Sequence, residues 1–463
     1  MLRLEASGDC LFDEYLPEVL RVLPGELARA DAILSDPALL APFRTRWQAM
    51  AEESHSPMLS MGRPSLPMAT YLRLMWLKQR TGWGYERLMG EVSDSFALRR
   101  FCRIPVVEDV PDESTVRKLT RRLGPDVVDE LTRGVLGKAV HERGFRPRAL
   151  RADSTVAEAD IAYPTDVGLA ADAVRVLAKA ARKVAGAVPA TTRHVADRCR
   201  AVGKRVRAIG RSLRRRSGEA KEAVQTLTEQ AAAQVATSVR ESKRLLAEAK
   251  RSRSRAKGIS KKARARAIAR LEHLIGLSER VVDQVRARFA GERIPDRLVS
   301  LFDPDARPVR RGKLSRPNEF GYVVQLAEVT ANSRKGTRGL LLPPKLAAGS
   351  THENTLLAGT AVELERLGVK LKEAPFDAGF GRVATTKALP GLDRIFISGS
   401  ATNTGSARTR RRLARFRVGC EGRISHVKRE YHAGRSRLRG DQGARIWESW
   451  TVLAYDVDTV ARM

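Results

Sequence analysis

LKEAPFDAGFG, residues 371–381, is the stretch that decides the fold class. It reads as a short strand that stops at a carboxylate, Asp377, and is followed by an Ala/Gly turn. An amphipathic helix is expected before it, over HENTLLAGTAVELERLGV (352–369), and another short strand after it, over RIFIS (394–398). Strands that alternate with helices predict an α/β domain.

Three further strands extend this pattern upstream. EFGYVVQLAEVTA (319–331) alternates apolar and polar residues as an antiparallel strand does, and RGLLLPPKLA (338–347) supplies a strand interrupted at Pro343. RPRALRADSTV (146–156) reads as a strand that stops at Asp153. The expected order is strand, long helical insertion, two strands, helix, two strands and a final helix.

The first part of the chain is expected to be helical. Residues 1–60 read as a leader of short helices and turns, and residues 61–144 contain helical patterns that end in DESTVRKLTRRLG (112–124). Asp112 or Ser114 is the expected N-cap of this last helix. Its polar face carries basic residues that we interpret as DNA contacts of a helix-turn-helix-like module: Arg117, Lys118 and Arg121. The alternative is a small helical bundle with a solvated basic face.

Residues 171–294 form a long insertion rich in Ala, Arg, Lys, Val and Leu. Residues 175–288 hold 31 basic and 9 acidic residues and almost no aromatic ones. The composition and the three- and four-residue spacing of apolar positions predict paired antiparallel, coiled-coil-like helices. This insertion either contacts a phosphate backbone or is a solvated helical hairpin.

The charge of the whole chain indicates a polyanionic partner. Its 463 residues include 85 Lys and Arg against 53 Asp and Glu, a formal net charge of +32 with a pI near 10.8. Each phosphate that Lys or Arg neutralises releases condensed counterions, so such a protein binds nucleic acid readily. Ribosomal proteins, membrane-surface proteins and nucleic-acid enzymes share this property, so charge alone indicates no mechanism.

Targeting and redox signals point to the cytoplasm, and we expect the protein to associate with the nucleoid of a prokaryotic cell. No apolar run reaches the roughly 18 to 20 residues needed to span a bilayer, and the first ten residues lack the apolar core of a secretory signal. The cysteines are far apart in the sequence and are expected to be reduced thiols that form no zinc site: Cys10, Cys102, Cys199 and Cys420.

Three acidic residues are candidate ligands for catalytic metal ions. Cleavage of a phosphodiester with Mg²⁺ needs carboxylates that converge from rigid elements on two ions. Asp153 and Asp377 are expected at the ends of strands, and Glu421 lies in the very basic helical stretch ARTRRRLARFRVGCEGRISHVKREYHAG (407–434). Taken singly, each has a simpler explanation: a turn cap for Asp153, a turn residue for Asp377 and a surface ion pair for Glu421.

Other candidates are weaker. Asp160 and Asp166 follow Asp153 closely, but Asp166 lies in a Pro/Gly turn and neither ends a hydrophobic strand. Glu319 is interpreted as structural, and His352 and Glu353 as capping groups at a helix start. The tryptophans are interpreted as core anchors rather than base-stacking platforms: Trp83, Trp447 and Trp450.

Several segments resemble insertion-sequence transposases of the DDE type, whose catalytic domain has an RNase H-like fold. The likeness covers residues from about 60 to 170 and from 300 to 455, and its main motifs are RADSTVAEADIAYPTDVGL, PFDAGFGR and VGCEGRISHVKREYHAG. The resemblance implies Asp153, Asp377 and Glu421 as the catalytic, metal-binding acids. It also implies that residues 145–170 and 295–463 form the catalytic domain.

Many relatives place Tyr, Arg, Glu and Lys around the catalytic Glu with two, three and six residues between successive members. Arg417, Glu421 and Lys428 fit this spacing, whereas Ala414 stands at the Tyr position. The resemblance therefore implies that Arg417 and Lys428 contact phosphates of the transposon end, without a contact from Tyr.

The function that the resemblance implies is DNA transposition with two Mg²⁺ (or Mn²⁺) ions. The enzyme would cleave at the transposon ends and transfer the freed 3′-OH into target DNA, acting as a homodimer or higher oligomer on DNA and without a membrane. Two alternatives stay open: a non-catalytic DNA-binding protein derived from an inactivated transposase, and an RNase H-like nuclease without strand transfer.

Overall fold

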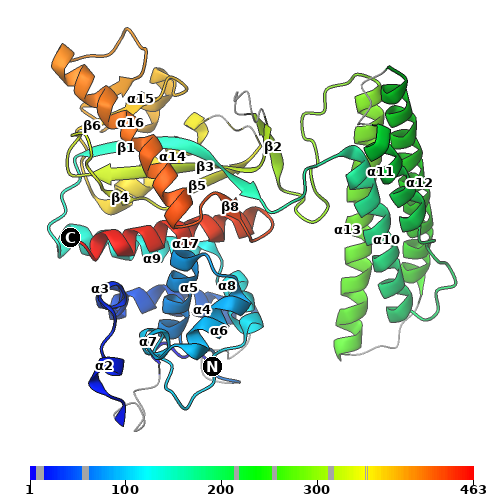
Figure 1. Ribbon diagram of the computed structural model, residues 1–463, viewed down its shortest axis with the longest axis horizontal. Helices are drawn as coiled ribbons and strands as arrows, with labels where there is room; N and C mark the ends of the chain where they lie inside the picture. Colours follow the sequence, from blue (N-terminus) through cyan, green and yellow to red (C-terminus); the bar gives the residue numbers. More distant parts are fainter. Residues whose placement is uncertain are drawn as a thin grey trace. The chain divides into compact units, whose positions relative to one another are not determined.

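The computed structural model describes residues 1–6, 15–54, 62–212, 218–252, 258–310, 318–349, 351 and 353–463. The chain forms two compact units: Met1–Asp160 with Tyr322–Met463, and Ile161–Gly321. The first contains most of a mixed sheet together with many helices, and the second is mainly helical (Figure 1). The protein is therefore a mixed α/β chain, as the sequence predicts.

The sheet of the first unit is built on two long strands, β1 (Ala149–Ala159) and β3 (Asn318–Thr330). Five shorter strands complete it: β4 (Leu340–Leu341), β5 (Lys345–Ala348), β6 (Glu373–Phe376), β7 (Arg394–Ile397) and β8 (Arg435–Ser436). β1 is parallel to β6 and β8, β6 is parallel to β7, and β3 is antiparallel to β4 and β5. Since β1 lies between β3 and β6, it is an interior strand.

Most strands predicted from the sequence are confirmed. The pattern over 319–331 is β3, and the strand interrupted at Pro343 is β4 followed by β5. β6 ends at Phe376, directly before Asp377, and β7 matches the prediction over 394–398. The exception is the first strand, which does not stop at Asp153 but continues to Ala159.

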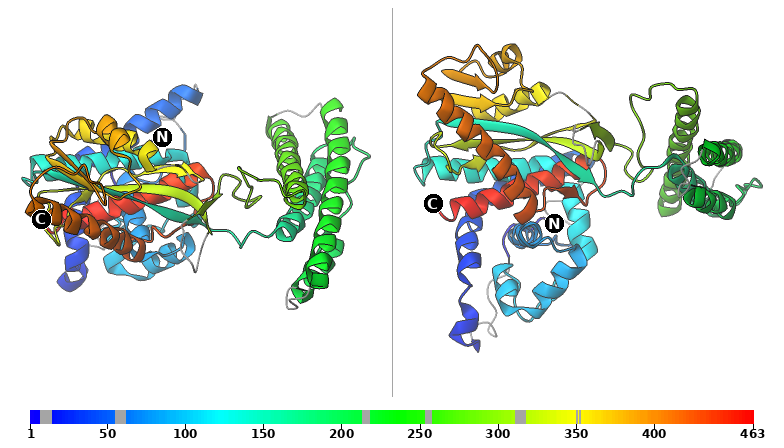
Figure 2. Two further views of the ribbon diagram at one scale, coloured as in Figure 1. Left: turned by 90° about the horizontal axis from the view of Figure 1, so that it is seen from above. Right: turned by 45° about the horizontal axis from the view of Figure 1, so that its top comes forward.

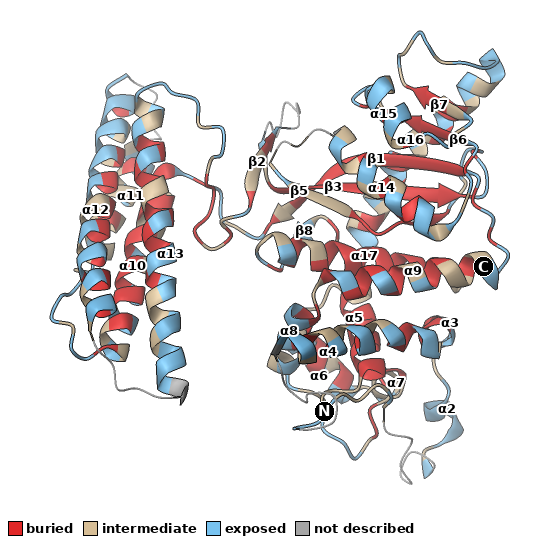
Figure 3. Cartoon of the chain, turned by 180° about the vertical axis from the view of Figure 1, so that it is seen from behind, coloured by how far each residue is buried: buried red, intermediate tan, exposed pale blue. Residues whose placement is uncertain are grey.

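Helices cover both faces of this sheet: α14 (Glu353–Leu367), α15 (Arg382–Ala388), α16 (Ala407–Glu430) and α17 (Asp441–Val460). α16 contacts β1, β6 and β7, whereas α14 contacts β5 on the opposite face (Figures 1 and 3). Figure 2 shows α16 running along its face of the sheet from two further directions. The predicted helices over 352–369 and 407–434 are thus confirmed as α14 and α16.

α2 (Glu18–Arg21) has no buried residue, whereas the other N-terminal helices share one hydrophobic core with the sheet: α3 (Gly25–Leu34), η1 (Pro37–Leu40), α4 (Ala41–Ser54), α5 (Met68–Thr81), α6 (Tyr85–Asp94), α7 (Phe96–Phe101), α8 (Glu113–Leu123) and α9 (Pro125–His141). α5 is buried from Met68 to Gln79. Its Tyr71 ring lies edge-on to Trp450 of α17, with centroids 5.8 Å apart. Trp447 and Trp450 are buried, which confirms them as core anchors, and Trp83 packs partly buried against the same core.

Helix α8 begins as predicted, with the Asp112 carboxylate capping it by accepting a hydrogen bond from the Ser114 amide. Residues 102–112 separate α8 from α7. The two helices are therefore not joined by the tight turn of a helix-turn-helix motif.

The second unit is a bundle of four helices, α10 (Asp166–Ala187), α11 (Cys199–Ser212), α12 (Gly218–Arg251) and α13 (Gly258–Phe289), followed by β2 (Arg307–Arg310). The prediction of a helical hairpin was incomplete, because α10 and α11 also contribute to its core of Val, Leu, Ile and Ala side chains. Asp166 does not lie in a turn. It begins α10, is buried, and pairs with Arg288 and Arg297.

In the part of the chain that the structure describes, no helix combines the length and the apolar composition needed to cross a membrane.

Glu448 on α17 generates a prediction about stability. It is buried, and both of its carboxylate oxygens lack a hydrogen-bond partner among the described residues. Burial raises its pKa from 4.5 to about 8, against a smaller opposing effect of Lys428. The folded protein therefore keeps a proton that the unfolded chain releases. This contribution to stability is complete below about pH 4.5 and is lost as the pH rises toward 8.

We predict that Glu448→Gln raises the free energy of unfolding by at least about 2 kcal/mol at pH 8 and changes it little at pH 5. Urea unfolding at the two pH values measures the effect. Glu365→Gln, at an exposed position of α14, is the matched control and should change neither value. An equal gain at both pH values would show that ionisation of Glu448 is not the cause.

Candidate active site

Helix α16 is fixed to the sheet by a buried cluster of three charges. Glu328 of β3 accepts from Arg151 of β1 at 2.7 Å and from Arg423 of α16 at 3.1 Å. All three side chains are at most 7% exposed. Two of the three flank the candidate acids, because Arg151 precedes Asp153 by two residues and Arg423 follows Glu421 by two. The Arg151–Glu328–Arg423 cluster therefore fixes the backbone next to both acids.

Two further contacts bring α16 close to β1. Arg151 Nη1 donates to the Phe416 carbonyl at 3.0 Å, and its guanidinium lies 4.7 Å from the centre of the Phe416 ring. A Cβ at Gly419 would lie 2.2 Å from the same Nη1 atom. Since Arg151 is buried and held by Glu328, a larger residue at position 419 would force α16 away from the strand.

Asp153 and Asp377 stand at the same level of neighbouring strands. β1 and β6 run parallel with Ala149 opposite Glu373, and each aspartate lies four residues after that pair. Neighbouring strands are about 4.8 Å apart, and residues separated by an even number share a face. Arg151 and Glu373 both contact α16, so the two aspartates belong to the face that α16 covers.

The sequence placed Asp153 at a strand end, and the structure corrects this. Asp153 is an interior residue of β1, since Ser154, Thr155 and Val156 continue the strand as buried residues. β-branched Thr and Val favour this extended backbone even where the hydrophobic pattern is broken by polar side chains. Only Asp377 directly follows a strand.

Arg417 joins the other two acids. Its Nη1 atom lies 3.5 Å from Asp377 Oδ1 and 3.6 Å from Glu421 Oε1. The two carboxylate oxygens are therefore no more than the sum of these distances, about 7 Å, apart. Asp377 and Glu421 are half-exposed or more, whereas Arg417 is 18% exposed. A cation thus already lies between two solvent-facing carboxylates.

Asp153 is close to the same part of α16. Burial raises the pKa of the Cys420 thiol, and the carboxylates of Asp153 and Glu328 raise it further. Cys420 directly precedes Glu421, so the field of Asp153 acts on the helix beside the third acid. The structure thus joins Asp377 and Glu421 through Arg417 and places Asp153 on the neighbouring strand, on the face that α16 covers.

Among the residues that the structure describes, no three His, Cys, Asp or Glu side chains are already arranged as a metal site. The donors nevertheless fit the expected ion, because Mg²⁺ and Mn²⁺ prefer carboxylate oxygens. Arg417 lies between two of the carboxylates and offsets one of their two negative charges. Asp153, Asp377 and Glu421 are the residues that could hold such an ion.

The residues predicted to contact DNA lie in different settings. Lys428 is partly buried and donates from Nζ to the Val156 carbonyl at 3.0 Å, so its ammonium group faces β1. On α8, Arg117 pairs with Glu113 at 3.1 Å, and Lys118 donates to Ser114 at 3.3 Å. Both remain exposed, as does Arg121. The basic face of α8 is thus open to solvent.

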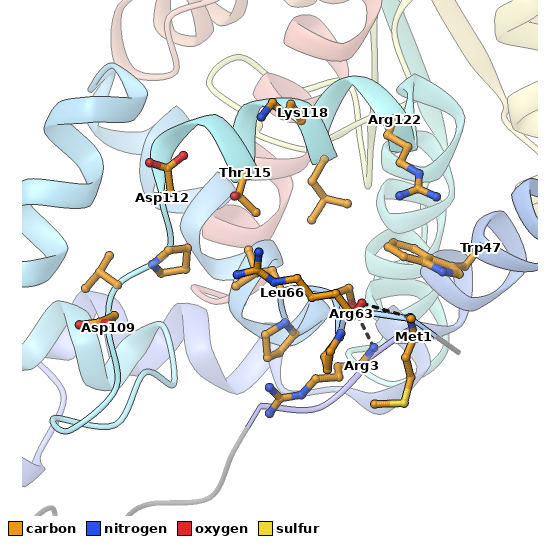
Figure 4. Close-up of a pocket in the computed structure, with 17 residues that line it drawn as sticks. Met1, Arg3, Trp47, Arg63, Leu66, Asp109, Asp112, Thr115, Lys118 and Arg122 are labelled. Carbon is orange, nitrogen blue, oxygen red and sulfur yellow. Dashed lines mark hydrogen bonds between the residues drawn. The ribbon is translucent and has the colours of Figure 1, made fainter. Parts of the chain in front are cut away.

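Lys118 also lines a cavity of about 830 Å³ in the N-terminal helical region (Figure 4). Basic and acidic residues stand at its sides, including Arg63, Arg122, Asp109 and Asp112. Met1 and Arg3 close it on one side, where the Met1 ammonium donates to the Arg63 carbonyl at 3.2 Å. None of the three candidate acids lines this cavity, so it is separate from the candidate active site.

The weaker candidates have structural partners. Asp160 follows β1, is exposed, and lies 3.8 Å from Arg435. Glu319 is opposite Val309 in the pairing of β2 with the first residues of β3.

Cys102, Cys199 and Cys420 are free thiols, while Cys10 and His352 lie outside the described residues. The side chain of Glu353 lies outside them as well.

Comparison with known families gives one match. Residues 29–122 match the model of a family described as Transposase domain (DUF772). The match supports a transposase. A transposase acts on DNA, which agrees with the net charge of +32. The matched segment ends before Asp153, so it says nothing about the acids. Searches of curated proteins and of solved structures found no match.

Sequence reasoning missed the residues that hold the candidate site together. Arg151, Glu328 and Arg423 each lie within a segment whose element was predicted correctly. The available signal was a charged residue in an otherwise apolar strand, such as Glu328 in YVVQLAEVT. A buried charge of this kind requires a partner.

We predict that Glu328→Gln lowers the free energy of unfolding by about 3–5 kcal/mol, because it leaves Arg151 and Arg423 buried without a counter-charge. Urea unfolding at neutral pH measures the loss. Glu91→Gln breaks an exposed pair with Arg87 and should cost less than about 0.5 kcal/mol. Equal losses in the two variants would contradict the importance assigned to the buried cluster.

Proposed function

We propose that this protein is a DDE-type DNA transposase with an RNase H-like catalytic domain. The observation that carries the proposal is that Arg417 joins Asp377 and Glu421, while Asp153 lies at the same level of the neighbouring strand. The transposase domain at residues 29–122 supports the same function from an independent part of the chain.

The three carboxylates would hold two Mg²⁺ or Mn²⁺ ions. Ions bound there would activate water or a 3′-OH and stabilise charge on the phosphate oxygens. Asp153 and Asp377 act from neighbouring parallel strands, so the sheet fixes the position of both. Glu421 acts from α16, which the Arg151–Glu328–Arg423 cluster holds against the sheet.

Arg417 has two functions in this proposal. Without metal its single positive charge lies between Asp377 and Glu421, which reduces the repulsion between the two carboxylates. With metal bound to the carboxylates, its guanidinium would be released to pair with a phosphate of the transposon end. Arginine is suited to this exchange, because the same planar group can pair with either carboxylate or phosphate.

Helix α16 also supplies positive charge beside the acids. Arg408, Arg411 and Arg415 are exposed and follow each other at three- and four-residue spacing, so they lie on one side of the helix. None of them pairs with an acidic group among the described residues. Together with the basic face of α8 they would bind DNA phosphates at the ends and at the target.

We predict that Asp153→Asn, Asp377→Asn and Glu421→Gln each reduce cleavage of a DNA duplex carrying the element's terminal inverted repeat by at least about 100-fold, because each removes a charged metal ligand. Gel analysis of end-labelled DNA with Mg²⁺ measures nicking, and DNA affinity in EDTA should stay within about 3-fold of wild type. Asp160→Asn, at an exposed position just after β1, is the matched control and should cleave normally.

The same assay separates the proposal from its alternatives. An inactivated transposase would bind the duplex without any cleavage that depends on metal. A nuclease would cleave but would not join a pre-cut 3′-OH end to plasmid DNA, which a transposase does. Normal cleavage by the three acid variants would refute the assignment of the site.

A further inference from the structure

Helix α11 of the second unit carries an unusual concentration of positive charge. Its 14 residues include five basic residues and no acidic ones. Val202 and Ile209 are buried in the core of the bundle, which fixes the rotation of the helix. The opposite face exposes four of the basic residues, which we call the α11 stripe: Arg200, Lys204, Arg207 and Arg211. Their spacing of four, three and four residues places them on one line along the helix.

Some cations elsewhere in the bundle, unlike those of the stripe, have acidic partners. Lys243 lies 2.5 Å from Glu279, and Lys250 lies 2.6 Å from Glu272, joining α12 to α13. In the described part of the chain, no carboxylate forms an ion pair with any member of the α11 stripe. All four positive charges of the stripe are therefore available to an anionic partner.

The stripe borders a groove of about 600 Å³ between α11 and α12. Arg200, Lys204 and Arg211 line it, and Ala201, Ala208 and Leu227 provide small or apolar walls. Arg205 is held at its edge, donating to Gln230 at 3.2 Å and to the Ala201 carbonyl at 2.9 Å. The groove is thus positively charged and bordered by a side chain already fixed in place.

We infer that the α11 stripe binds the phosphate backbone of duplex DNA, at a site separate from the active site. Eleven residues of helix span about 16 Å. One DNA strand presents a phosphate every 3.4 Å or so along the duplex axis, so the stripe can follow several consecutive phosphates. Three of its four members are arginines, whose planar groups pair well with phosphate oxygens.

A membrane surface fits this helix less well. A helix that lies on a membrane buries an apolar face among the lipids. The apolar residues of α11, Val202 and Ile209 among them, face the bundle core, and its exposed side is cationic. The identification of DNA as the polyanion rests on the proposed function, while the position of the binding surface rests on α11 itself.

The test compares two variants of the full-length chain with the same change in net charge. The stripe variant combines Arg200→Gln, Lys204→Gln, Arg207→Gln and Arg211→Gln. The control variant combines Lys243→Gln, Lys250→Gln, Arg280→Gln and Arg286→Gln, four exposed cations of the same bundle that have acidic partners. Fluorescence anisotropy in EDTA measures binding to a duplex with the terminal repeat and to a random duplex, from 50 to 300 mM KCl.

We predict that the slope of log affinity against log salt becomes shallower by about 2 to 4 in the stripe variant and by less than about 1 in the control. The effect should be the same on both duplexes, because phosphate contacts carry no sequence information. A third variant with Arg200→Lys, Arg207→Lys and Arg211→Lys keeps the charge and should keep the slope. Equal slopes in the stripe and control variants would overturn the inference.

Further measurements keep this result independent of folding and of catalysis. Circular dichroism and thermal unfolding should be the same in the stripe and control variants. If light scattering shows a changed oligomeric state with an unchanged salt slope, the stripe contacts protein and the inference is wrong. If the wild-type chain cleaves DNA and the stripe variant keeps the wild-type salt slope, this inference is refuted and the proposed function stands. If the salt slope depends on the stripe but the wild-type chain does not cleave DNA, the proposed function is refuted and this inference stands.

Discussion

The arrangement of the candidate active site depends on one buried interaction, the pairing of Glu328 with Arg151 and Arg423. Charged groups are costly to bury, and they are retained in a core only when partners compensate them. Here a single carboxylate compensates two guanidinium groups, and its Oε1 atom also accepts from the Gly339 amide at 2.7 Å. The cluster joins β1, β3 and α16, which are distant in the sequence, into one rigid frame.

The candidate acids lie where this frame reaches solvent. Asp153 follows the buried Arg151 by two residues, and Glu421 precedes the buried Arg423 by two. Asp377 lies directly after β6. The buried charges fix the backbone, while in the proposed function the more exposed Asp377 and Glu421 would exchange Arg417 for a metal ion. A site that must bind ions and DNA in turn benefits from this combination of a rigid support and accessible ligands.

Local sequence patterns predicted the elements of this site but not their assembly. The strand before Asp377 and the very basic helix of Glu421 follow from the sequence over short local stretches. The partners of Glu328 are 177 and 95 residues away, so no local pattern could identify them. Asp153 was placed at a strand end because the apolar run stops at its carboxylate, whereas tertiary packing buries the polar Ser154 and Thr155 within β1. The acidic residues of the helical bundle similarly gained partners, Asp166 with Arg288 and Arg297, only through the fold.

The central claim is that Asp153, Asp377 and Glu421 share one metal site. A direct test replaces Mg²⁺ with Fe²⁺ and adds ascorbate and peroxide, so that hydroxyl radicals form at the bound ion. The radicals cut the backbone only near that ion, and mass spectrometry maps the cuts. The account predicts cuts beside residues 153, 377 and 421 together, suppressed by excess Mg²⁺. Cuts at only one of the three segments, or none that Mg²⁺ suppresses, would contradict it.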